Sequence, residues 1–250
     1  DNLMQCYPHN TEKKYLFQCY EYLQGETLAQ WLHRQEKPLN LDEILPILQQ
    51  TALALNAMHR LEMLHQDIRP KNIMVINAEN AMKIKLIDYG STAVRGLVEI
   101  NPKNANRALG TLAFMAPEYF IDHSPSVHSD QFSLAVMAYY LFTKQLPYGT
   151  DLARCNSLKQ MKKVQYHSIR KYRPDLPIWL DKILGQALSI EPIHRFEALS
   201  ELIHNLMHPS KELLNSKPPA IIERDPLRFW QMSCAVLGLL FLLSIAWPFI

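Results

Sequence analysis

Three side chains in the first half of the chain have the types and spacing that a metal-assisted transfer to a hydroxyl requires. Asp67 and Asn72 lie five residues apart in segment 65–72, which reads HQDIRPKN, and Asp88 follows in segment 88–90, which reads DYG. A loop of this length can aim a carboxylate at a hydroxyl and an amide at a metal ion, and a second carboxylate can complete the metal site. We therefore expect Asp67, Asn72 and Asp88 to converge on one site.

Two short apolar segments must bring the metal ligands together. Segments 73–76 and 83–87 have the composition of β-strands, and residues 77–80 separate them. We predict a hairpin that places Asn72 beside Asp88. Each motif also has a simpler interpretation, because a lone aspartate is often a turn residue or a helix cap. The order of the motifs, with a hairpin between them, favours a functional site.

The remaining patterns predict an aromatic strand followed by a mostly helical domain. Residues 15–20 are strand-like, residues 21–25 form a turn, and residues 28–32 begin a helical pattern. Asn40 and Glu43 predict a capping box at the start of a long helix. Further helices are expected over residues 132–141, 158–163, 179–188 and 198–207.

Composition excludes several classes of protein. The chain has 250 residues, of which 48% are hydrophobic, so it can bury a sizeable core in one or two domains. Its 26 Lys and Arg residues nearly balance 24 Asp and Glu residues, and no basic stripe suggests a nucleic-acid partner. The four cysteines are far apart, which is typical of reduced thiols and not of a disulfide framework or a zinc site.

The last 22 residues, 229–250, contain no Asp, Glu, Lys, Arg or His. A helix of that length spans roughly 33 Å, which is enough to cross the hydrocarbon of a bilayer. Trp230 and Trp247 lie near its ends, and Arg224 and Arg228 precede it. We expect a single transmembrane helix, with the bulk of the protein cytoplasmic by the positive-inside tendency. A buried hairpin of the domain is the alternative.

The order of HQDIRPKN, DYG and APE (residues 116–118) resembles the catalytic half of a protein kinase over roughly residues 15–208. The resemblance implies an α+β, protein-kinase-like fold with a mostly helical C-terminal lobe and an incomplete N-terminal lobe. It implies ATP and Mg²⁺ as cofactors, with Mn²⁺ as an alternative ion. Asp67 would orient the acceptor hydroxyl and take its proton, and Arg69 would contact the γ-phosphate. Asn72 and Asp88 would hold the metal ions.

Further residues favour a protein serine/threonine kinase over a small-molecule phosphotransferase of the same fold. Thr111 matches the threonine of the peptide-binding segment whose hydroxyl contacts the catalytic aspartate. Glu118 would pair in the interior with Arg195. Asp130 would start the central helix and brace the catalytic loop, and His65 would pack beneath that loop as structural support.

The same resemblance implies a site for adenine. The backbone of Glu21 and Leu23 would hydrogen-bond the ring from the hinge, with Tyr20 at the gatekeeper position. Met74 would form the apolar floor under the ring, and Ile87 would lie behind it. Ordinary core packing is the alternative for these apolar side chains.

Two features depart from the family pattern. None of the seven glycines precedes Gly25, and the sequence has neither a G-x-G-x-x-G loop nor a strand lysine in a V-A-I-K context. We therefore expect a piece of a longer polypeptide, with a remnant of the small lobe and hinge (1–26), the large lobe (27–208), a linker (209–228) and a transmembrane helix (229–250). A catalytically inactive pseudokinase-like membrane scaffold is the alternative to an active kinase, and a small-molecule phosphotransferase is the second alternative.

Regulation is also expected to differ. Gln66 replaces the arginine that in many kinases clamps a phosphorylated activation loop, and residues 93–110 contain no Ser, Thr or Tyr. Loop phosphorylation is therefore not expected to switch the protein on. Gln66, Arg69, DYG and the apolar tail together resemble a bacterial group that joins an N-terminal metal-dependent protein phosphatase domain to a membrane-anchored serine/threonine kinase. That resemblance implies a protein substrate, an inner-membrane location and a phosphatase domain in the parent polypeptide.

Overall fold

The computed structural model describes residues 2–7, 18–78, 81–94, 112–121, 125–215 and 226–246. The chain divides into two compact units, Asp1–Leu214 and Asn215–Ile250. The first unit contains all of the described residues of the expected site. The boundaries expected from the sequence, at residues 26, 208 and 228, stay predictions.

The first unit is mainly helical, as the apolar periodicity indicates. Its described helices are α1 (Leu28–His33), α2 (Leu41–His59), α4 (Val127–Thr143), α5 (Leu158–Met161), α6 (Ile178–Ala187), α7 (Leu199–Met207) and α8 (Lys211–Leu214). Short 3₁₀ helices connect them: η1 (Pro70–Asn72), η2 (Pro117–Phe120), η3 (Leu152–Arg154), η4 (Ile169–Lys171) and η5 (Pro192–His194). Each of the expected helices forms, within a few residues of the expected range.

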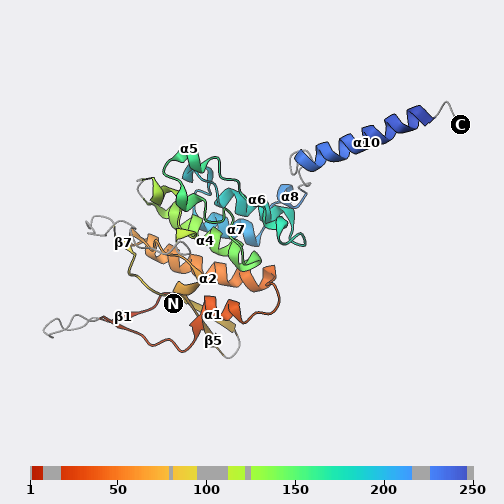
Figure 1. Cartoon of the computed structure of the whole chain (residues 1–250). Helices are drawn as coiled ribbons and strands as arrows, with labels where there is room; N and C mark the ends of the chain where they lie inside the picture. The colour runs from red at the N-terminus through yellow and green to blue at the C-terminus, as the bar shows by residue number, and fades with distance from the viewer. Residues whose placement is uncertain are drawn as a thin grey trace. The chain divides into compact units, whose positions relative to one another are not determined.

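The long helix α2 starts where its cap predicts. The Asn40 side chain accepts from the Glu43 backbone N–H at 3.0 Å, and the Glu43 carboxylate accepts from the Asn40 N–H at 2.8 Å. Two N–H groups that the helix cannot satisfy internally are thereby paired. In Figure 1 this helix runs beside α4.

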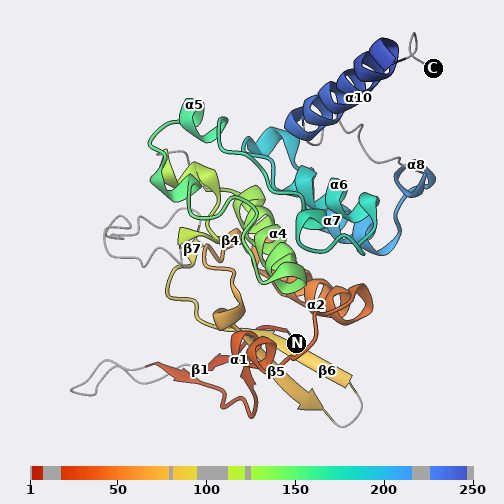
Figure 2. The ribbon, with the colours of Figure 1, turned by 45° about the vertical axis from the view of Figure 1, so that its right-hand side comes forward.

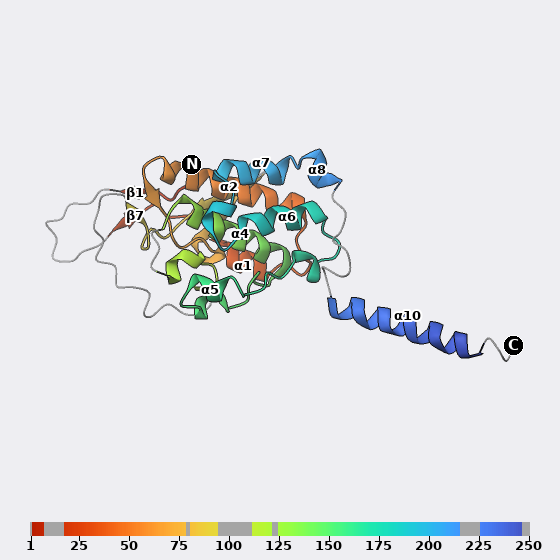
Figure 3. The same ribbon diagram turned by 90° about the horizontal axis from the view of Figure 1, so that it is seen from above.

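The core of the unit lies around α4. Nearly every side chain from Ser129 to Phe142 is buried, including Tyr139 and Phe132. A helix that is apolar on all sides must be covered on all sides. Helices α2, α6 and α7 pack against α4 and supply that cover, as Figure 3 shows from above.

The described strands form small antiparallel sheets. One has the order β3-β5-β6 and consists of β3 (Glu26–Thr27), β5 (Ile73–Ala78) and β6 (Ala81–Leu86). The register Ile73↔Leu86 through Ala78↔Ala81 confirms the predicted hairpin. The others pair β1 (Cys6–Tyr7) with β2 (Cys19–Tyr20), and β4 (Met63–Leu64) with β7 (Ala93–Val94). Figure 2 shows β5 and β6 beside α1.

The opening strand differs from its prediction. A strand was expected over residues 15–20, but β2 contains only Cys19 and Tyr20, and residues 8–17 lie outside the described part. Residues 2–5, for which no strand was expected, pair along β6 through the bonds Met4 N to Leu86 O (3.0 Å) and Leu86 N to Asn2 O (2.8 Å). Tertiary pairing, and not local propensity, fixes this segment.

The sheet approaches the hinge closely at Gly25. A Cβ atom at this position would overlap the carbonyl oxygen of Val75. Glycine is therefore required here because the two backbones meet without room for a side chain. This contact holds the turn before β3 against β5, next to the residues expected to bind adenine.

The second unit consists, in its described part, of the helix α10 (Pro226–Ala246). The expected helix over 229–250 forms, but it begins three residues earlier because proline is tolerated in a first turn, and residues 247–250 lie outside the described part. Among the described residues, no helix combines the length and the apolar content needed to cross a bilayer. The expectation of a transmembrane helix is therefore unsupported by the structure.

Candidate active site

The loop from His65 to Asn72 is closed by its last residue. The Asn72 amide nitrogen donates to the Asp67 carbonyl oxygen at 2.9 Å and to Asp67 Oδ2 at 2.8 Å. Asn72 is buried and lies in η1, where Pro70 fixes the first turn. The structure thus brings together the carboxylate and the amide that the spacing singled out.

Arg69 lies beside the same carboxylate. Its Nε is 3.3 Å from Asp67 Oδ1, and both side chains are largely buried. The guanidinium therefore places positive charge next to Asp67 while part of it stays accessible. A cation at this point can attract a phosphate group to the loop.

The Asp130 carboxylate binds the backbone at the start of this loop. Its two carboxylate oxygens accept from the backbone N–H groups of His65 (3.0 Å) and Gln66 (2.9 Å). Gln66 has a left-handed backbone with φ of 66°, which is costly for a residue with a side chain. The charge-assisted bond from Asp130, itself fully buried on α4, offsets that cost.

His59 is a partner of Asp130 that the sequence did not reveal. Its Nε2 lies 2.9 Å from Asp130 Oδ2, and it comes from the last turn of α2. A lone histidine at a helix end carries no signal of such a contact. Only the packing of α2 against α4 creates it.

His65 is fully buried beneath the loop, at the position expected for structural support. Its Nδ1 accepts from the Asp67 N–H at 3.3 Å, and its Nε2 lies 3.3 Å from the Ile87 carbonyl oxygen. Burial lowers the pKa of the imidazole, although the nearby Asp130 carboxylate acts in the opposite direction. The neutral ring thus links the loop to the residue before Asp88.

A backbone hydrogen bond holds the residue before Asp88 against this loop. The Ile87 N–H donates to the Asn72 carbonyl oxygen at 2.9 Å, directly after the β5–β6 hairpin. Asp88 has a φ of 66°, and its Oδ1 accepts from the Gly90 N–H at 3.1 Å. Aspartate tolerates the left-handed region because its side chain can bond locally in this way. The carboxylate remains exposed.

The donor set fits a divalent ion that is shared with a nucleotide. Asn72 uses its amide nitrogen on Asp67, so its Oδ1 has no hydrogen-bond partner among the described residues. Oxygen donors of this kind suit Mg²⁺, which proteins commonly bind through one or two carboxylates together with phosphates. No group of three or more His, Cys, Asp or Glu side chains that could hold a metal occurs in the described segments.

The residues expected to bind adenine lie along the hinge and β5. Glu21 Oε1 accepts from Lys85 Nζ at 2.5 Å and from the Gln5 N–H at 2.7 Å, and the contact with Lys85 lowers the pKa of the Glu21 carboxyl. Met74 pairs with Lys85 across the hairpin, so the two side chains share one face of the sheet. Ile73 and Val75 are buried on the other face. Met74 therefore lies on the same face as Lys85, which contacts Glu21, and its expected role under adenine stays a prediction.

The other residues expected to bind adenine make fewer contacts with this face of the sheet. Leu23 is half-buried, and its backbone has no hydrogen-bond partner in the part of the chain that the structure describes. Ile87 is also half-buried. Tyr20 is 38% exposed and its hydroxyl donates to the Gln18 side chain, so the structure gives no contact that would make it a gatekeeper.

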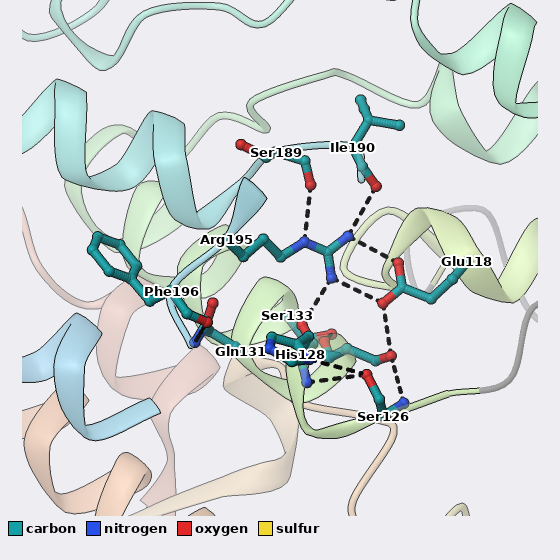
Figure 4. Close-up of polar contacts among 10 residues, drawn as sticks. Glu118, Ser126, His128, Gln131, Ser133, Ser189, Ile190, Arg195 and Phe196 are labelled. Atoms are coloured by element: carbon teal, nitrogen blue, oxygen red, sulfur yellow. Dashed lines mark hydrogen bonds and ion pairs between the residues drawn. The ribbon is translucent and has the colours of Figure 1, made fainter. Parts of the chain in front are cut away.

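Glu118 and Arg195 form a bidentate ion pair in the interior, drawn in Figure 4. Nη1–Oε1 and Nη2–Oε2 are both 2.9 Å, and both side chains are buried. Arg195 also donates to the carbonyls of His128, Ser189 and Ile190. Every strong donor of the guanidinium is thereby used, which is the condition for a stable buried ion pair.

The charge state of Glu118 follows from these contacts. Burial by itself raises the pKa of the Glu118 carboxyl, but the hydrogen bonds and charge of Arg195 and the Ser129 hydroxyl at 2.7 Å outweigh it, and the pKa is lowered. The sequence did not single out Ser129. Thr111, which was expected to position a peptide, lies outside the described residues.

The fold and these motifs define the protein kinase class. A family model described as "Protein kinase domain" matches residues 1–209. The chain therefore belongs to the protein kinase domain family.

Several curated relatives are bacterial. The chain is 25% identical over 201 residues to the serine/threonine-protein kinase PrkC of Bacillus subtilis, covering 80% of this chain and 30% of that protein. It is 31% identical over 185 residues to the serine/threonine-protein kinase Pkn3 of Myxococcus xanthus, covering 72% and 34%. The chain thus spans about a third of the length of these relatives.

Solved structures share the fold. The kinase domain of Mycobacterium tuberculosis PknI matches with a TM-score of 0.63 at 23% identity, over 84% of this chain and 72% of that one. A structure of the Rad53 kinase domain and SCD2 matches with a TM-score of 0.62 at 19% identity, over 88% and 72%. At these identities the likeness establishes the protein-kinase-like fold alone.

Proposed function

We propose that this chain carries the large lobe of a protein serine/threonine kinase and transfers the γ-phosphoryl group of ATP to a hydroxyl of a protein. The arrangement of Asp67, Asn72 and Asp88 supports this proposal most directly. Asp130 fixes the loop that carries the first two, and the bond from Ile87 N–H to Asn72 O joins that loop to the third. The names of the bacterial relatives agree with it.

The roles of the residues follow from their chemistry. Asp67 orients the acceptor hydroxyl and takes its proton, because Asn72 holds its carboxylate in place. Arg69 places its charge where the transferred phosphate must pass. Asn72 and Asp88 would hold Mg²⁺, which when bound with ATP neutralises charge on the phosphates. Glu21, Leu23, Met74 and Ile87 would hold the adenine.

The test is transfer of label from ATP labelled at the γ-phosphate to a library of peptides that contain serine, threonine or tyrosine. The whole chain should label serine and threonine. Asp67→Asn and Asp88→Ala should each lose at least about 100-fold, the usual contribution of a proton acceptor or a metal ligand. Asp151→Asn changes an exposed carboxylate outside the site and serves as the matched control.

Each other outcome selects an alternative. Labelling that is unchanged in both variants contradicts the assignment to Asp67 and Asp88. Binding of ATP without transfer favours the pseudokinase-like scaffold, for which the missing glycine-rich loop and strand lysine are the argument. Label that appears on a metabolite and never on protein favours the small-molecule phosphotransferase.

We further propose membrane attachment and kinship with the bacterial phosphatase–kinase group, and both rest on the sequence alone. The support for attachment is the absence of Asp, Glu, Lys, Arg and His from residues 229–250. A phosphatase domain would belong to a longer parent polypeptide. Cells that produce the whole chain should retain it in the membrane fraction, and a version ending at Leu214, the end of the first compact unit, should not be retained. Equal distribution of the two versions contradicts attachment through this segment.

A further inference from the structure

We propose that the hydroxyl of Tyr89 positions Asp88 by tying the turn of residues 88–90 to the segment of residues 2–5. The inference deepens the proposed function, because it assigns a positioning residue to the metal ligand of that site. Tyr89 would not touch the reacting atoms. It would act by fixing where the Asp88 carboxylate points.

The hydroxyl has two carbonyl oxygens within reach, one in the segment of residues 2–5 and one at the end of β6. Tyr89 Oη donates to the Met4 carbonyl oxygen at 2.9 Å and lies 3.2 Å from that of Leu86. The ring meets His65 edge to face, with centroids 6.1 Å apart and planes at 64°. Since His65 Nε2 also lies 3.3 Å from the Ile87 carbonyl, the residues on both sides of Asp88 are held.

The segment that receives this bond is itself well fixed. Met4 and Asn2 pair with the backbone of Leu86, and the Gln5 N–H donates to the Glu21 carboxylate at 2.7 Å. The Asn2 side chain donates to the Ile84 carbonyl at 3.0 Å and to the Gln50 side chain at 3.1 Å. A hydrogen bond to a fixed segment restrains the turn, whereas a hydrogen bond to a mobile segment would not.

The turn needs such a restraint. Asp88 has a φ of 66°, a conformation that a chain leaves readily unless its surroundings hold it. A phenylalanine at position 89 would fill the same space and keep the contact with His65, but it would have no donor for Met4 O. A tyrosine hydroxyl is protonated at neutral pH and can therefore donate this bond.

The test compares Tyr89→Phe with Tyr139→Phe in the whole chain. Tyr139 also donates its hydroxyl to a carbonyl, that of His167 at 2.8 Å, but it lies on α4 in the helical core. Each variant loses one hydroxyl and one hydrogen bond of the same kind. An effect that occurs only in Tyr89→Phe is therefore due to the position of the Tyr89 hydrogen bond beside Asp88, and not to the loss of a hydroxyl in general.

The first readout needs no catalytic activity. Hydrogen exchange of the peptide covering residues 86–92, which contains the amides of Ile87, Gly90 and Thr92, should be about three- to tenfold faster in Tyr89→Phe, as loss of one hydrogen bond implies. It should be unchanged in Tyr139→Phe. Equal exchange in the wild type and Tyr89→Phe overturns the proposal.

The second readout is binding of a fluorescent ATP analogue titrated with Mg²⁺. Tyr89→Phe should need about three- to tenfold more Mg²⁺ for half-saturation, whereas Tyr139→Phe should match the wild type. Faster exchange with an unchanged Mg²⁺ requirement overturns the positioning role, because the hydroxyl would then hold the turn without serving Asp88. A wild type that binds no nucleotide also overturns it. Intact binding without phosphoryl transfer rejects only the proposed activity and leaves this inference standing.

Discussion

The side-chain amide of Asn72 donates to two oxygens of Asp67, one on the backbone and one on the carboxylate, at 2.9 and 2.8 Å. These bonds close the loop on itself. The residue expected to bind metal thereby also orients the residue expected to take the proton. Such preorganisation lowers the cost of reaching the reactive geometry.

Removal of this amide should affect both stability and metal use. Asn72→Ala leaves the buried Asp67 oxygens without their donor, which should lower the free energy of unfolding by about 1–3 kcal/mol. The Mg²⁺ concentration for half-maximal transfer should rise at least about tenfold. Urea unfolding and a Mg²⁺ titration check the two effects. Asn156→Ala, which changes an exposed asparagine, should alter neither.

The buried pair of Glu118 and Arg195 should be costly to break. Glu118→Gln keeps the size of the side chain but leaves the guanidinium charge uncompensated in the interior, which typically costs about 3–5 kcal/mol. Urea unfolding should show the loss. Asp151→Asn breaks an exposed ion pair with Arg154, and its midpoint should match that of the wild type. Similar midpoints for the two variants would mean that the buried pair contributes little.

Acid should weaken the fold through His65. Burial lowers the pKa of this imidazole below its ordinary value of 6.5, so the unfolded chain takes up the proton at a higher pH than the folded one. The contribution of His65 is therefore complete above pH 6.5 and is lost as the pH falls below that value. Unfolding free energies measured from about pH 8 to about pH 5 should fall less steeply in His65→Asn than in the wild type.

An exposed histidine supplies the control for that measurement. His33→Asn should retain the pH dependence of the wild type, because His33 is exposed on α1. If His65→Asn also retains it, then protonation of other groups causes the acid sensitivity, and the neutral buried imidazole is not responsible.

Phosphorylation of the activation segment should not be needed for activity. Gln66 carries no charge that could bind a phosphate, and residues 93–110 contain no hydroxyl side chain. Treatment of the active protein with a broad-specificity phosphatase should leave its rate of transfer unchanged. The double variant Ser91→Ala and Thr92→Ala removes the only serine and the only threonine between Asp88 and Gly110. Loss of activity on phosphatase treatment, together with an essential phosphate at either position, would refute the prediction.

Local patterns in the sequence predict the elements that position the site. The Asn40–Glu43 cap and the β5–β6 hairpin each depend on residues that are close in the chain, whereas α4 begins at Val127, five residues before its expected range. Their physical causes, capping and periodicity, can therefore be recognised in one sequence. The meeting of Glu118 with Arg195 was predictable only through the resemblance to a family.

Contacts between distant segments could not be predicted in this way. His59 meets Asp130 only because α2 packs on α4, and Tyr89 meets Met4 only because residues 2–5 pair along β6. Neither pair has a local signature. The segment 229–250 illustrates a different limit, since hydropathy predicted a transmembrane helix, whereas the helix described up to Ala246 lacks the length and apolar content needed to cross a bilayer.

The ion pair of Glu118 and Arg195 joins positions 77 residues apart. A ribosome that adds about 5 to 20 residues per second needs about 4 to 15 s to cover that distance. Throughout this interval the emerging acid has no cation to meet, so the segment around η2 cannot be buried at low cost. Completion of the helical core must therefore wait for the last third of the first unit to be synthesised, and a nascent chain stalled before Arg195 would be a natural client for chaperones.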